Sequence, residues 1–173
     1  QGVTRFRGTA CFEDPHTVRI VGDDGAESRI HGEKILIATG SSPLRPAVFP
    51  FEDDRVHDSN EILDLKALPK KLAVIGGGVI GSEYAGTFAA LGAEVHLIDG
   101  RDVLMPFLDS EISCALTDAM TANGVRFHWN QKVVRCDASR AGDVVLTMDS
   151  GAEPACDGVL VCGTESRAVM AVD

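Results

Sequence analysis

The strongest hydrophobic pattern of the chain lies in its middle, where short apolar runs alternate with segments of helical periodicity. Short apolar runs are typical of buried parallel strands, and they occur over 71–75, 94–98 and 125–128. Between them, apolar residues recur three and four positions apart over 79–91 and between 109 and 123. This alternation predicts an α/β fold with a Rossmann-like β-α-β-α-β parallel sheet.

The pattern changes after residue 131. Three short runs over 132–136, 143–148 and 152–155 are separated by turns that contain glycine, and this spacing predicts an antiparallel three-stranded β-meander. A last apolar run over 157–163 predicts one more buried strand. We expect the end of that strand to lie near the carboxyl edge of the parallel sheet.

The first third of the chain predicts β structure. Residues 17–21 and 26–30 flank a Gly-Asp-Asp-Gly turn and predict a hairpin. The run over 34–38 is mostly apolar and is followed by small residues and a proline, so it predicts a strand that is buried on both faces. Prolines and acidic residues between 44 and 54 indicate a connection, and 58–63 predicts a brief helix.

The glycine turn between the first parallel strand and the first helix carries the clearest chemical signal. Gly76, Gly78 and Gly81 have G-x-G-x-x-G spacing. Asp99 ends the next strand about 20 residues later, which completes the pattern of a dinucleotide-binding site. Gly78 would let the backbone approach a pyrophosphate, which would bind to the N–H groups of the following helix. The alternative is a glycine-rich turn that binds nothing.

Asp99 bears on which nucleotide would bind. A carboxylate at this position can accept hydrogen bonds from the two ribose hydroxyls of NAD(H), and it would repel the 2′-phosphate of NADP(H). Arg101 lies two residues further on and could bind that phosphate. The sequence therefore favours NAD(H) and leaves NADP(H) open.

Charge and composition exclude several classes of function. The formal net charge is −10, from 26 acidic against 16 basic residues, which argues against a nucleic-acid or anionic membrane surface. We find no apolar run of membrane-spanning length. The five cysteines lack C-x-x-C spacing, so we expect free thiols, no metal site and a cytoplasmic protein.

Nearly the whole chain resembles one family. Residues 35–43 are similar to its Ala-Thr-Gly strand, 76–85 to its nucleotide turn, and 58–63 and 107–111 to further segments. The family is that of the class I FAD-dependent pyridine nucleotide-disulfide oxidoreductases. Among its members, the soluble pyridine nucleotide transhydrogenases have the most similar segments.

The resemblance implies a division of the chain and a set of partners. Residues 1–46 would be the end of a split FAD-binding domain, 47–157 an NAD(P)-binding domain, and 158–173 a return strand towards the FAD domain. The cofactors implied are NAD(H), with NADP(H) left open, and FAD in the intact parent. The parent would be a homodimer whose remaining FAD-binding and interface domains lie outside this sequence.

Several site residues are implied by the resemblance alone. Glu83 matches a residue near the nicotinamide carboxamide, and Val133 matches an apolar contact of the adenine. Gly163 matches a nicotinamide contact, although the sequence after it departs from the family pattern. The complete set of expected cofactor-binding residues is Gly76, Gly78, Val79, Ile80, Gly81, Glu83, Asp99, Arg101, Val133, Gly163, Thr39 and Gly40.

The sequence contains no second G-x-G-x-x-G and no C-x-x-x-x-C pair. We therefore expect the chain to bind NAD(H) without turnover and without catalytic residues of its own, as part of an enzyme that moves hydride between NAD(P)H and flavin. The alternatives are a domain of a dihydrolipoamide dehydrogenase, or a non-catalytic module that senses nucleotides.

Overall fold

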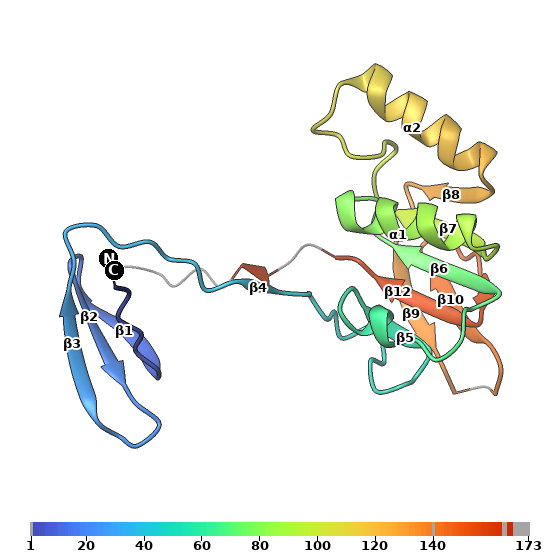
Figure 1. The fold of residues 1–173 in the computed structure, drawn as a ribbon. Coiled ribbons are helices and arrows are strands. Elements are labelled where there is room, and N and C mark those ends of the chain that lie inside the picture. The colour runs from blue at the N-terminus through green and yellow to red at the C-terminus, as the bar shows by residue number, and fades with distance from the viewer. Residues whose placement is uncertain (1, 140, 164–165, 168–173) are drawn as a thin grey trace. The chain divides into compact units, whose positions relative to one another are not determined.

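The structure, a computed structural model, describes residues 2–139, 141–163 and 166–167 (Figure 1). The chain forms two compact units. The first contains the residues up to Ser41, and the second runs from Ser42 to Ser166. The first unit holds a three-stranded sheet, and the second holds a five-stranded sheet, a three-stranded sheet and the G-x-G-x-x-G motif.

The first unit is a three-stranded antiparallel sheet in the order β1-β2-β3. Its strands are β1 (Thr9–Asp14), β2 (Thr17–Val21) and β3 (Glu27–His31). The predicted hairpin is thus confirmed as β2 and β3, and β1 extends it by one strand. Arg29 donates two hydrogen bonds to Glu13 across the exposed surface, at 2.8 and 2.9 Å.

The prediction of a buried strand over 34–38 is wrong. These residues form no strand, and the side chain of Leu36 is 89% exposed. An apolar run becomes a buried strand only when neighbouring strands take up its backbone hydrogen bonds and other elements cover its faces. In the described part of the chain, only β4 (Ser41–Ser42) of this region pairs, with β13 (Ser166–Arg167).

The second unit is built on a five-stranded parallel sheet in the order β5-β12-β6-β7-β8. The three strands of the predicted β-α-β-α-β unit and the predicted return strand are all present. The bounds are β5 (Val56–Asp58), β6 (Lys71–Ile75), β7 (Glu94–Asp99), β8 (Val125–Trp129) and β12 (Gly158–Val161).

Strand β5 was not predicted. It has only three residues, and it exists because its backbone pairs with β12, which lies about a hundred positions later in the sequence. The brief helix expected over 58–63 is a 3-10 helix, η1 (Glu61–Asp64).

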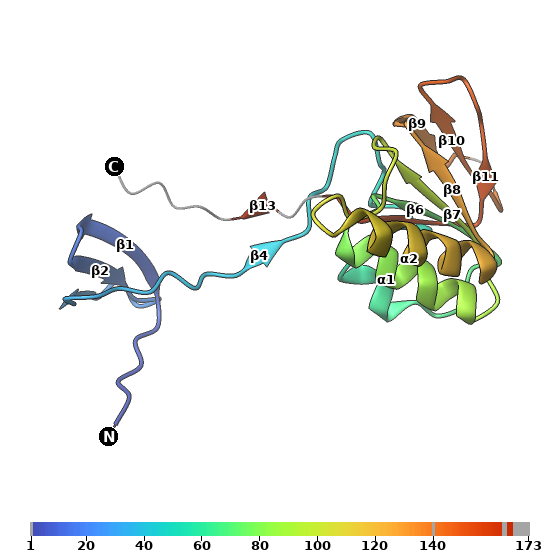
Figure 2. The same cartoon turned by 90° about the horizontal axis from the view of Figure 1, so that it is seen from above.

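The parallel sheet is covered on both faces (Figure 2). Helices α1 (Val79–Ala90) and α2 (Ser110–Ala122) cover one face. The other face carries the predicted meander, with β9 (Val133–Asp137), β10 (Val144–Met148) and β11 (Ala155–Cys156) in the order β11-β10-β9.

Alternate residues of β6 show how the two cores arise. Leu72 and Val74 are buried in the core on the helix side, whereas Ala73 between them is buried in the core on the meander side. This alternation is that of a strand with apolar layers on both sides. Among the residues that the structure describes, no helix combines the length and the apolar composition of a membrane span.

Candidate functional site

The turn between β6 and α1 requires glycine at two positions. Gly76 has φ of +106°, and a β-carbon on it would lie 2.7 Å from the carbonyl oxygen of Cys162. A β-carbon on Gly81 would lie 1.8 Å from the carbonyl oxygen of Gly76. Both contacts are with backbone, which cannot move aside, so these glycines bring the turn, α1 and the end of β12 together.

Gly78 differs from these two because no protein atom stands against it. It is the N-cap residue of α1, with φ of −78°, and a β-carbon there would meet no atom within 4 Å. No side chain caps α1, and its first turn contains no acidic residue. Helix α2 is different, since Asp109 accepts a hydrogen bond from the N–H of Glu111 at 2.9 Å. The open N-terminus of α1 therefore fits a phosphate group.

Asp99, the predicted ribose ligand, ends β7 beside this turn. It is buried, with 7% of its surface exposed, and its Oδ2 accepts a hydrogen bond from the N–H of Gly77 at 2.5 Å. A β-carbon on Gly77 would lie 3.2 Å from the same oxygen. The sequence analysis missed Gly77, which the G-x-G-x-x-G pattern leaves free, although its place between two motif glycines is a signal of close backbone approach.

Arg101 lies against Asp99. Its Nε donates to Oδ1 at 2.9 Å and its Nη2 to Oδ2 at 2.7 Å, so the guanidinium forms a bidentate pair with the carboxylate. Burial by itself would raise the pKa of Asp99. Hydrogen bonds from Arg101 and from the N–H of Gly77 outweigh burial, and the pKa of Asp99 lies below its ordinary value. Asp99 is therefore ionised at neutral pH.

The other predicted residues of the second unit are spread around this centre. Val79, Ile80 and Glu83 lie on the first turns of α1 with exposed side chains. Val133 is half-buried and packs on the meander-side core. Gly163 follows β12, and a β-carbon on it would meet Leu44 at 3.7 Å.

Thr39 and Gly40 belong to the first unit, whereas Asp99 and the glycine turn belong to the second. The predicted motif residues are thus brought together by β6, α1 and β7. Of the residues that only the family resemblance implied, Glu83 lies on α1, Gly163 follows Cys162 after β12, and Val133 begins β9.

Cys162 is a second residue that the sequence analysis missed as part of the site. Its N–H donates to the carbonyl of Ile75 at 2.8 Å, which continues the pairing of β12 with β6 up to the glycine turn. Burial raises the pKa of the Cys162 thiol to about 12, so the thiol is neutral at physiological pH. The expectation that this strand ends at the carboxyl edge of the parallel sheet is confirmed, since Val161 pairs with Ile75, the last residue of β6.

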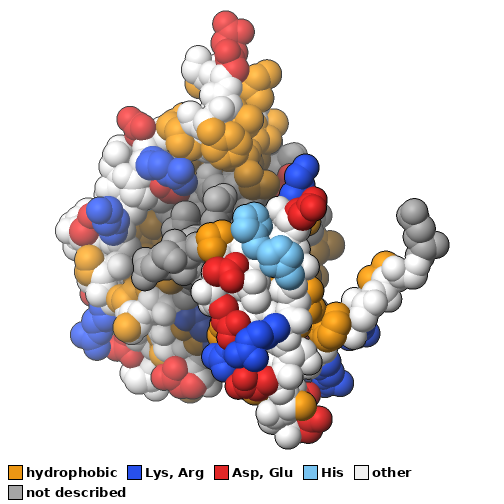
Figure 3. All heavy atoms as spheres, turned by 90° about the vertical axis from the view of Figure 1, so that its left-hand side faces the viewer, with side chains coloured by type: hydrophobic (Ala, Val, Ile, Leu, Met, Phe, Trp, Pro, Cys, Tyr) orange, Lys and Arg blue, Asp and Glu red, His pale blue; other side chains and the backbone are white. Residues whose placement is uncertain are grey.

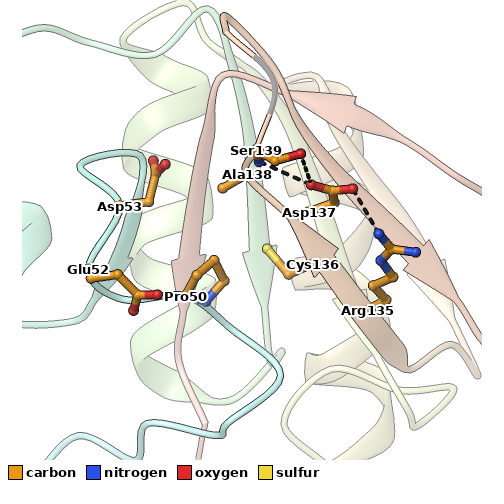
Figure 4. A pocket seen from close by; sticks show the side chains of 8 residues that line it. All are labelled: Pro50, Glu52, Asp53, Arg135, Cys136, Asp137, Ala138 and Ser139. Carbon is orange, nitrogen blue, oxygen red and sulfur yellow. Dashed lines mark hydrogen bonds and ion pairs between the residues drawn. The ribbon is translucent and has the colours of Figure 1, made fainter.

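A cavity of about 370 Å³ opens beside β9 of the meander, and no residue of the glycine turn lines it (Figure 4). Three of the polar residues that line it bind one another, since Asp137 accepts hydrogen bonds from Ser139 and Arg135. Burial raises the pKa of the Cys136 thiol to about 11. None of the residues that line this cavity is a predicted site residue.

The family model for pyridine nucleotide-disulphide oxidoreductases matches residues 1–167. The chain belongs to this family. A curated relative, the soluble pyridine nucleotide transhydrogenase of Pseudomonas paraeruginosa, is 42% identical over 160 residues. The alignment covers 92% of this chain and 34% of the relative, so the chain spans about a third of the relative's length.

Two solved structures have a similar fold. LpdA from Mycobacterium tuberculosis superposes with a TM-score of 0.79 at 28% identity, over 95% of this chain and 36% of that one. The HOCl-induced flavoprotein disulfide reductase RclA from Escherichia coli superposes with a TM-score of 0.74 at 31% identity, over 93% of this chain and 36% of that one.

Proposed function

We propose that the second unit is the NAD(H)-binding domain of an FAD-dependent oxidoreductase similar to the soluble pyridine nucleotide transhydrogenases. One observation carries the proposal. The uncapped N-terminus of α1 at Gly78 and the buried carboxylate of Asp99 flank the same turn, where a pyrophosphate and a ribose would each find a partner. The family match and the transhydrogenase relatives support this assignment.

Each residue has a binding role in this proposal. The pyrophosphate lies over Gly78 at the N–H groups of the first turn of α1, beside Val79 and Ile80. Asp99 accepts hydrogen bonds from ribose hydroxyls. By the family resemblance, Glu83 orients the nicotinamide carboxamide; its exposed side chain lies on the same helix.

Three further roles follow from the family resemblance. Val133 contacts the adenine and Gly163 the nicotinamide. Thr39 and Gly40 bind the cofactor in the FAD-binding domain of the parent. When bound, the nicotinamide supplies a hydride to the flavin. This chain's residues bind and orient the nucleotide without turnover, and the parent acts as a homodimer in the cytoplasm.

Calorimetric titration of the chain with NADH tests the proposal, with Gly78→Ala as the decisive variant. The added methyl meets no protein atom within 4 Å and the backbone φ is ordinary, so the variant folds. The methyl nevertheless occupies the place proposed for the pyrophosphate. We expect NADH binding to weaken by at least about tenfold, since the phosphates lose their close approach to the backbone.

Gly86→Ala is the matched control. Gly86 lies on the same helix, and a β-carbon there also meets no atom within 4 Å. We expect this variant to bind NADH like the wild type. Failure of the wild-type chain to bind NADH, or equal binding by the Gly78→Ala variant, would overturn the proposal.

A further inference from the structure

The carboxylate of Asp99 is fully engaged by the protein itself. Oδ1 accepts from the backbone N–H of Arg101 at 2.9 Å and from its Nε at 2.9 Å. Oδ2 accepts from the N–H of Gly77 at 2.5 Å and from Nη2 of Arg101 at 2.7 Å. A carboxylate offers about four acceptor positions, so four donors leave no position for a ribose hydroxyl.

Two of these four donors are fixed and two can move. The backbone around Asp99 and Arg101 is held by neighbouring N–H groups, since Gln131 donates to the carbonyl of Asp99 and Asn130 to that of Arg101, both at 3.1 Å. The guanidinium stands on a flexible stem, and the Arg101 side chain is 45% exposed. Only the guanidinium can therefore leave to make room for a ribose.

We propose that Arg101 is a specificity-determining residue. While it is paired with Asp99, its guanidinium occupies the carboxylate that would bind the ribose. Once it has swung away, the guanidinium can bind a 2′-phosphate. This inference rests on the proposed function, because it concerns the same nucleotide site. Both nucleotides require the same outward movement of Arg101. After this movement Arg101 is exposed to solvent when NADH is bound and contacts the 2′-phosphate when NADPH is bound, so it affects the two affinities differently.

The two nucleotides differ in how they compensate for the broken pair. NADH replaces the guanidinium with neutral hydroxyl donors and leaves Arg101 to solvent. NADPH brings a phosphate that forms a charge-assisted hydrogen-bonded pair with the freed guanidinium, although the same phosphate is repelled by Asp99. Arg101 therefore weakens NADH binding and strengthens NADPH binding, which makes the site a dual one.

The Arg101→Met variant tests this inference by calorimetric titration with NADH and, separately, with NADPH. Methionine keeps much of the apolar stem and removes the charge. We expect NADH to bind about three- to tenfold more tightly, because no ion pair has to be broken. We expect NADPH to bind at least about tenfold more weakly, because its phosphate loses the guanidinium.

Arg101→Lys provides a second readout. Lysine keeps the charge but cannot form a bidentate pair with both carboxylate oxygens. We expect it to bind NADH more tightly than the wild type and to bind NADPH within about threefold of the wild type. Unchanged NADH affinity in both variants, or weaker NADH binding in the Met variant, would overturn the inference.

Arg135→Met is the matched control. Arg135 also pairs with an aspartate two residues away, Asp137 at 3.0 Å, but it lies on the meander. We expect this variant to bind both nucleotides like the wild type. If Gly78→Ala abolishes NADH binding while the Arg101 variants behave as the wild type, the NAD(H) domain stands and only the role of Arg101 fails.

Discussion

Arg45 donates two hydrogen bonds from its guanidinium to Oδ2 of Asp58, from Nε at 2.9 Å and from Nη2 at 2.7 Å. Asp58 ends strand β5, and its Oδ1 accepts from the N–H groups of Asn60 and Glu61, both at 2.9 Å. One buried carboxylate thus joins the segment that enters the second unit to the start of η1. The arrangement parallels that of Asp99, but here it connects structural segments.

Replacement of Asp58 by alanine should destabilise the second unit. The guanidinium of Arg45 and two backbone N–H groups would lose their acceptor, and the Asp58 side chain is only 4% exposed. We expect the free energy of unfolding in urea to fall by about 2 kcal/mol. Glu61→Gln is the control, since it alters the exposed partner of the same arginine, and its effect should stay below about 0.5 kcal/mol.

The stability of the second unit should fall in acid. Burial would raise the pKa of Asp58, but the N–H of Glu61 and the guanidinium of Arg45 outweigh it and hold the pKa below its ordinary value. A carboxyl with a depressed folded-state pKa contributes stability above its unfolded pKa of about 3.9, and this is lost as pH falls through the folded value.

Urea unfolding at several pH values measures this contribution. The difference in unfolding free energy between the wild type and Asp58→Asn should be constant from pH 7 to about pH 5 and should shrink below about pH 4. A difference that does not depend on pH would show that the charge of Asp58 does not contribute.

Alanine substitutions at the glycine turn and further along α1 should change the unfolding free energy in opposite directions. Gly76→Ala and Gly81→Ala place a methyl against backbone oxygen, and each should cost at least about 2 kcal/mol of unfolding free energy. Gly86→Ala, in open space within α1, should stabilise by up to about 1 kcal/mol because alanine loses less backbone entropy. Thermal unfolding of the three variants compares them directly.

The cysteines should separate into two classes of reactivity. Cys11 and Cys114 are exposed. Burial raises the pKa of Cys136 to about 11 and those of Cys156 and Cys162 to about 12. Because the thiolate is the reactive form, a disulfide reagent at pH 8 should modify two thiols rapidly and the other three only after unfolding. Rapid loss of more than two thiols in the native protein would contradict this.

The sequence predicts the central sheet well because a buried parallel strand has a local signature. The runs at β6, β7 and β8 are apolar wherever both faces are covered, and the glycine turn follows from the spacing of its motif. The run over 34–38 carries the same signature without the neighbours that would bury it, so the same reasoning failed there. Strand β5 has too few residues for any pattern.

The pairing of Arg101 with Asp99 shows a different limit. Each residue suggested a contact with the nucleotide, and nothing in their spacing indicated that they would bind each other. The orientation of a side chain two residues beyond a strand depends on the backbone turn and on its neighbours Asn130 and Gln131, which are remote in sequence. The sequence therefore identified both residues as candidates for the site, but it did not predict the ion pair between them.

Exposed apolar side chains gather at the end of the second unit that carries α2 and the loop before it, at the top of Figure 3. Phe107 and Ile112 are 68% and 58% exposed there. The parallel sheet itself has no such exposed face, since helices cover one side and the meander the other.

The pairing of β4 with β13 brings Ser42 and Ser166, the two ends of the second unit, onto adjacent strands. A unit whose ends are neighbours and whose sheet is covered by its own chain is suited to circular permutation. A short linker could join these ends, and new termini could be opened at the Asn123-Gly124 turn. The order in which the elements are synthesised would change, while the glycine turn and Asp99 would keep their places.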